Sequence, residues 1–170
     1  MKPAGLFAST AITTTSAVPV VDPLSGANLF QEAQLLDVRF DALRMRAGLL
    51  LEQRVALQLR EANTGVLVCR GVTGIEWLAR PRSTPLTAWN VVGSSISSGD
   101  KAVELRLALF PDAKVAISAA QIEFYNCEVD GIGGIPDYGD DAVSVDASLA
   151  SWESQIDLVN GSYIAARDGV

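Results

Sequence analysis

Four aspartates in the last third of the chain are the residues best suited to chemistry or binding. They lie among glycines within one stretch of 12 residues: Asp130, Asp137, Asp140 and Asp141. Carboxylate oxygens are hard ligands, and calcium accepts them in flexible cages. A bound Ca²⁺ or Mg²⁺ could polarise a carbonyl or phosphoryl oxygen and activate water, so a metal-assisted hydrolase is one alternative for the function. The spacing fits no EF-hand, however, and solvated acids on a flexible loop are the favoured interpretation. We predict no metal site and no cofactor.

These aspartates belong to a larger acidic region. Residues 115–166 carry nine carboxylates and no Lys or Arg. The first 114 residues hold 12 basic and 10 acidic side chains, whereas the last 56 hold 1 and 10. A surface of one sign attracts basic partners and repels phosphate backbones. The charge distribution therefore predicts a protein partner, possibly basic, that binds Asp130, Asp137, Asp140 and Asp141, and it argues against nucleic acid.

The side chains that most often carry catalysis are missing. The chain has no His, which removes Ser-His-Asp and Cys-His catalysis and His zinc sites. Neither glycine motif for binding nucleotide phosphates is present. We predict that the protein is not an enzyme. No apolar run approaches the ~20 residues of a spanning helix, so no membrane partner is expected.

Cys69 and Cys127 are the two cysteines, and both lie in apolar, strand-like surroundings. A free cysteine in such a place behaves as a small hydrophobic residue, so we expect both to be buried in the core. Two cysteines make no disulfide framework of the kind that secreted domains use. The start of the chain also lacks the sustained apolar region of a signal peptide. The sequence therefore predicts a cytoplasmic protein.

The elements that would position the acidic region are strands. Leu36, Val38 and Phe40 alternate with charged residues, which is the pattern of a half-buried strand. Similar stretches follow between turn residues at 66–77, 88–96, 103–110 and 115–129. Strands at this spacing predict a single, mostly β domain with little helix, arranged as an antiparallel meander, a sandwich or a barrel.

Residues 44–61 give conflicting signals. Their composition is rich in helix formers. From Leu49 to Leu59, however, the apolar residues recur at every second position and only Gln53 interrupts them, whereas a helix would place Arg54 in the middle of its apolar face. We favour a strand, with a turn at 47–48.

Two segments flank the predicted sheet. Residues 1–27 have few charges and much Ala, Ser, Thr and Pro, which predicts an N-terminal arm that could add an edge strand. Residues 28–129 form the predicted antiparallel core and begin with a short helical turn at 28–34. Residues 130–170 are an acidic, glycine-containing segment expected to pack on that core. Exchange of the arm between copies would make the chain a structural subunit of a homo-oligomer, a second alternative for its function.

Several strand patterns resemble uncharacterised bacterial β-rich proteins. The similar stretches lie at 36–41, 63–68, 88–92 and 123–125, and the likeness covers about residues 35–130. Those proteins are similar in turn to immunity proteins of polymorphic toxin systems. The resemblance implies a small, acidic protein that needs only a complementary surface, and it supplies no catalytic residues. We therefore favour a non-catalytic protein-binding module, immunity-like or of another kind, that uses an acidic surface.

Overall fold

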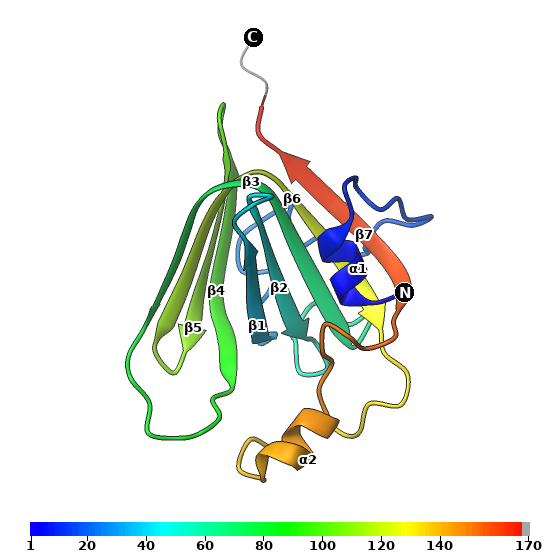
Figure 1. Cartoon of the computed structure of the whole chain (residues 1–170), viewed down its shortest axis with the longest axis vertical. Coiled ribbons are helices and arrows are strands. Elements are labelled where there is room, and N and C mark those ends of the chain that lie inside the picture. Colours follow the sequence, from blue (N-terminus) through cyan, green and yellow to red (C-terminus); the bar gives the residue numbers. More distant parts are fainter. Residues whose placement is uncertain (168–170) are drawn as a thin grey trace.

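A computed structural model describes residues 1–167 and contains one antiparallel sheet of seven strands (Figure 1). The strands are β1 (Gln34–Asp41), β2 (Arg46–Glu52), β3 (Thr64–Ala79), β4 (Trp89–Ser98), β5 (Val103–Phe110), β6 (Ala113–Glu128) and β7 (Asp157–Ala165). Two short helices, α1 (Pro3–Ala8) and α2 (Ala142–Ala147), lie outside the sheet. The mostly β, antiparallel, single-domain fold that the sequence predicts is confirmed.

The sheet closes because its two longest strands pair with each other. The strand order is β3-β2-β1-β4-β5-β6-β7, and β3 also pairs with β6. Each of these two strands has 16 residues. Along one side, β6 pairs first with β5 through residues 113–119 and then with β7 through residues 121–128. The result is a barrel-like sheet whose two halves share β3 and β6 and diverge from the top of the molecule (Figure 1).

A glycine allows the two long strands to bend between the halves. Gly71 has a φ of +62°, and a Cβ built there would come within 2.9 Å of the Ala120 Cβ. Only glycine adopts this conformation without strain. The register between β3 and β6 shifts just beyond it, between Val72 and Gly74, as in a β-bulge. This bend lets one pair of strands serve both halves of the sheet.

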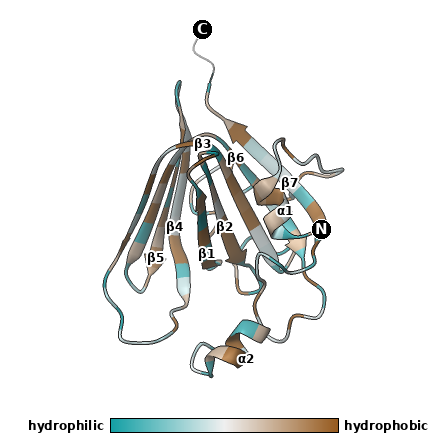
Figure 2. Cartoon of the chain, viewed as in Figure 1, coloured by the Kyte–Doolittle hydropathy of each residue, from teal (hydrophilic) through white to brown (hydrophobic). Residues whose placement is uncertain are grey.

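Strand β2 is buried on both of its faces. Leu49 and Leu51 point into the sheet interior, where they join the larger hydrophobic cluster, and Leu50 joins a smaller cluster on the outer face. That outer cluster includes Leu6 of α1 and Trp152 of the C-terminal segment. A strand buried on both faces loses the apolar–polar alternation. The continuous hydrophobicity of β2 in Figure 2 and the conflicting signals in the sequence have this common cause.

Residues 28–33 pair with the edge of β4 and do not form the predicted helical turn. Asn28 and Glu32 have positive φ angles of 60° and 64°, which no α-helix contains. Their backbone N–H groups donate to the carbonyls of Ser94 and Val91, both at 2.8 Å. Phe30 between them is fully buried and meets Phe124 edge to face, with ring centroids 5.7 Å apart. Burial of this aromatic ring decides the local conformation.

Three other local predictions need correction. The strand favoured within 44–61 is confirmed for 46–52 only, because 53–63 carries no regular structure. The turn before it comprises residues 42–45, with Met45 at a φ of 51°, and not 47–48. The described arm contains helix α1 and no strand. Its Pro3 supplies a first-turn residue whose missing N–H costs the helix nothing.

Replacing Phe30 by Ala should lower the free energy of unfolding by about 3–5 kcal/mol, because the cavity would lie between both halves of the sheet. Urea denaturation followed by tryptophan fluorescence measures this loss. Leu43, which is 93% exposed in the turn before β2, is the matched control. Its replacement by Ala should change the stability by less than about 0.5 kcal/mol. Equal effects at the two positions would contradict the packing role of Phe30.

Candidate binding surface

Arg54 attaches the acidic C-terminal segment to the sheet. Its guanidinium pairs with both oxygens of the fully buried Glu52 carboxylate, at 2.7 and 2.8 Å. It also donates to the carbonyls of Gly133, Gly134 and Ser148, at 2.6, 3.0 and 2.5 Å. All five N–H groups of one side chain are therefore used, which a lysine could not reproduce. This single side chain joins both ends of the segment between residues 133 and 148 to β2.

Trp152 provides a second attachment further along the segment. Its ring is buried against Phe7, with centroids 5.8 Å apart, and the Arg39 guanidinium lies 4.8 Å from the ring centroid. Its indole Nε1 donates to the Asp37 carboxylate at 2.7 Å. A buried tryptophan with its N–H satisfied contributes both apolar area and a fixed orientation. The C-terminal segment is therefore held by packing as well as by hydrogen bonds.

Three of the four aspartates singled out in the sequence lie together on the loop before α2. Asp137, Asp140 and Asp141 are all exposed. Asp141 caps the helix, because its Oδ1 accepts the N–H of Ser144 at 3.0 Å and its Oδ2 accepts the Ser144 hydroxyl at 2.7 Å. These hydrogen bonds lower the pKa of the Asp141 carboxyl, so it carries its charge throughout the neutral range. The cap fixes the position of the loop relative to α2.

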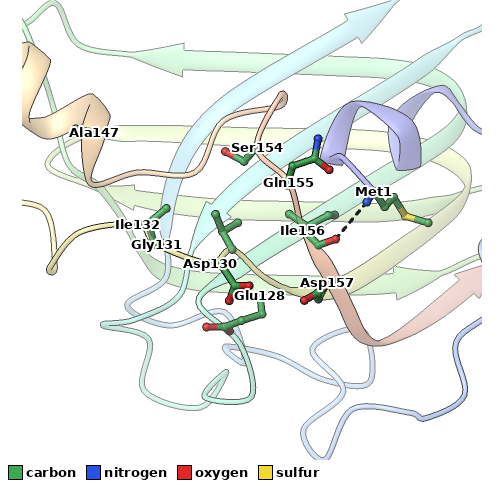
Figure 3. A pocket seen from close by; sticks show the side chains of 11 residues that line it. Met1, Glu128, Asp130, Gly131, Ile132, Ala147, Ser154, Gln155, Ile156 and Asp157 are labelled. Carbon is green, nitrogen blue, oxygen red and sulfur yellow. Dashed lines mark hydrogen bonds between the residues drawn. The ribbon is translucent and has the colours of Figure 1, made fainter.

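Asp130 lies apart from those three, beside a shallow hollow of about 360 Å³ (Figure 3). Glu128 and Asp157 lie on the same side of this hollow, which Ile156 and Met1 also line. The Glu128 carboxylate accepts two hydrogen bonds from Asn63, at 2.9 and 3.0 Å. Within residues 1–167, no three His, Cys, Asp or Glu side chains come close enough together to hold a metal ion. The structure does not gather the four aspartates into one cage.

Two acidic residues are internal, one of which belongs to the acidic region 115–166. Glu123 is fully buried on β6 and forms an ion pair with Arg70 of β3. Its carboxylate also accepts from Gln121 at 2.7 Å and from the Tyr125 hydroxyl at 2.8 Å. Burial, with the nearby Glu123 charge, raises the pKa of Tyr125 to about 12. Glu52 is the second, and both carboxylates are structural rather than available to a partner.

Arg70 also holds the N-terminal arm. Its guanidinium donates to the carbonyl of Ser9 and, at 3.3 Å, to that of Ala11. The backbone N–H of Thr13 then donates to the Tyr125 hydroxyl at 3.0 Å. Sequence reasoning missed this network, although one signal for it exists: Gln121, Glu123 and Tyr125 place polar groups at every second position of a predicted strand. The arm contacts its own chain, and its exchange between copies stays a prediction.

Comparisons with known proteins assign this chain to no family. The sequence matches no protein-family model and no curated protein. A solved structure of an uncharacterised protein from Neisseria gonorrhoeae is similar over 56% of this chain and 91% of that chain, with a TM-score of 0.43 and 15% identity. Within the described residues, neither helix is long and apolar enough to cross a membrane.

Replacing Arg54 by Met should lower the free energy of unfolding by about 3–5 kcal/mol, because it leaves the buried Glu52 charge without a partner. Chymotrypsin should then cleave more readily after Tyr138, since the segment loses its attachment to β2. Urea denaturation and limited proteolysis measure the two effects. The double variant Glu52→Gln/Arg54→Met removes the charge as well and should lose less stability. If the double variant loses as much as the single one, the ion pair is not the cause.

Stability should fall as the pH rises from about 10 to about 12. Burial, reinforced by the negative charge of Glu52, raises the pKa of Tyr138 to about 12, and Tyr125 is raised to a similar value. A tyrosine whose folded pKa exceeds its unfolded value of about 10 stabilises the fold fully below pH 10 and loses that contribution as the pH approaches 12. Urea denaturation at a series of pH values tests this. A Tyr125→Phe/Tyr138→Phe variant should show a smaller decline.

Proposed function

We propose that the protein is a non-catalytic protein-binding module that recognises a basic partner through the acidic C-terminal segment. One observation supports it most directly. Asp130, Asp137, Asp140 and Asp141 are exposed, and none of them forms an ion pair within residues 1–167. The two buried carboxylates of the fold, Glu52 and Glu123, have arginine partners instead. The exposed carboxylates therefore remain available to positive charges on another molecule.

The acidic segment is attached to the sheet and is not a tail free in solvent, which favours a role in recognition. Arg54 and Trp152 hold its two ends against the sheet, and Asp141 fixes the loop to α2. Preorganised groups lose less conformational entropy on binding, so the same contacts give more affinity. Charges arranged in this way mainly accelerate encounter and select the sign of the partner. The association rate should therefore fall as the salt concentration rises.

The two cysteines support a binding role over catalysis. Burial raises the pKa of Cys69 and Cys127 to about 12, so neither thiol forms a nucleophilic thiolate near neutral pH. Both cysteines are unbridged, which suits a reducing compartment such as the cytoplasm. An immunity-like protein requires a complementary surface and no reacting group, and this chain offers such a surface.

Affinity capture with matched baits tests the proposal. The loop bait carries Asp130→Asn, Asp137→Asn, Asp140→Asn and Asp141→Asn; asparagine at position 141 keeps the helix cap. The control bait removes the same charge elsewhere, through Glu32→Gln, Asp41→Asn, Asp100→Asn and Glu104→Gln. A partner from the native host should bind the wild-type and control baits and be lost, by about tenfold or more in affinity, from the loop bait.

Titration calorimetry of the captured partner then gives the affinities. A partner that binds all three baits equally would contradict recognition through the aspartates. Loss of binding from both variants would show that total charge, and not this segment, is recognised. Either result would overturn the proposed function.

A further inference from the structure

The second half of β3, residues 73–79, is an open edge of the sheet. Strand β2 pairs with β3 only as far as Arg70, and Met45 accepts the next N–H, that of Val72, at 2.8 Å. Beyond that point β6 pairs with one side of β3, and no backbone hydrogen bond within residues 1–167 covers the other side. In Figure 1 this half of β3 lies at the outside of the sheet, before the loop that leads to β4. Its outward N–H and C=O groups are free to pair with another strand.

This edge is apolar, unlike the free side of β1. Ile75, Trp77 and Leu78 are 39%, 44% and 49% exposed. The free side of β1 instead carries alternating charges, from Asp37 to Asp41, which discourage pairing with another chain. Monomeric proteins usually protect an edge with charges, prolines or bulges, and 75–79 has one charge and no proline. The exposed apolar residues and the lack of protecting charges are therefore typical of a protein–protein interface.

We propose that residues 76–80 pair antiparallel with the same residues of a second copy, so that two sheets become continuous. The two-fold axis passes between Leu78 of one chain and Leu78 of the other. In this register Glu76 lies opposite Arg80 of the second copy at both ends of the pairing. Trp77 lies opposite the small side chain of Ala79, again twice. Opposite charges and large-to-small contacts across strands are the pairs that stabilise a sheet.

Neighbouring registers lack this complementarity. Moving the axis to Trp77 places two indole rings opposite each other, and moving it to Glu76 places two carboxylates opposite each other. Arg80 forms an ion pair with Asp112 through its Nε at 2.7 Å, and its side chain is 84% exposed. The two outer nitrogens of the guanidinium therefore remain accessible to Glu76 of the second copy. The edge is thus self-complementary in one register.

Sedimentation equilibrium of the full chain over a range of concentrations tests the dimer. The wild-type protein should shift from monomer to dimer as its concentration rises. Leu78→Lys places two ammonium groups at the two-fold axis and should raise the dimer Kd by about tenfold or more. Val20→Lys, at an apolar residue of the N-terminal arm that is 86% exposed, is the matched control and should leave the Kd unchanged. Circular dichroism confirms that each variant folds.

A charge exchange tests the register. Glu76→Arg and Arg80→Glu should each raise the Kd by about tenfold, because each creates two like-charge pairs. The double variant restores opposite charges and should regain the wild-type Kd within about threefold. A chain that stays monomeric up to about 0.5 mM overturns the proposal. So does a dimer that Leu78→Lys leaves intact, or a double variant that dimerises no better than the single ones. None of these results depends on the acidic partner site.

Discussion

Two buried carboxylates, each paired with an arginine, hold together the parts of this protein that lie outside its sheet. Glu52 with Arg54 holds the C-terminal segment, and Glu123 with Arg70 holds the N-terminal arm. In both cases the carboxylate neutralises the charge of the largely buried guanidinium. The remaining N–H groups of the arginine donate to backbone carbonyls of the attached segment. Such a pair is strongly coupled, since removal of one partner leaves a desolvated charge. The arrangement of the flanking segments depends on these two contacts.

The sheet was predictable from the sequence wherever one face of a strand is buried and the other is solvated. The alternation of Val103, Leu105 and Leu107 in β5 reports such a strand, since all three are buried. β1 is a strand as predicted, but its half-buried pattern is not found: a register shift lies between Leu35 and Asp37, Leu36 and Val38 pack on different clusters, and Phe40 is 51% exposed. The local pattern was ambiguous in β2, where the favoured strand is confirmed although Leu49-Leu50-Leu51 is buried on both faces. Prediction failed at 28–33, whose conformation follows from the burial of Phe30. Neither cause is visible in a window of local sequence.

The candidate surface was predictable in composition and not in detail. The sequence places Asp130, Asp137, Asp140 and Asp141 on a glycine-containing segment, and the structure exposes all four. The sequence does not separate these acids from Glu123, because a charge count is silent about burial. It also gives no indication that Arg54, two residues after the end of β2, contacts residues 133–148, since these hydrogen bonds join positions about 80 to 94 residues apart. Long-range hydrogen bonds of this kind appear only once the chain is folded.

The switch of β6 from one neighbour to another has a further consequence. Because β6 pairs with β7 directly, residues 129–156 form a long connection between two adjacent antiparallel strands. Such a connection contributes no strand to the sheet, and changing its length alters the entropy of loop closure only slowly. Insertions, deletions and exchanges in this connection could therefore change its exposed side chains without changing the sheet, provided that the contacts of Arg54 and Trp152 are kept. The chain thus separates the residues that specify its fold from a connection that is free to vary in sequence and length.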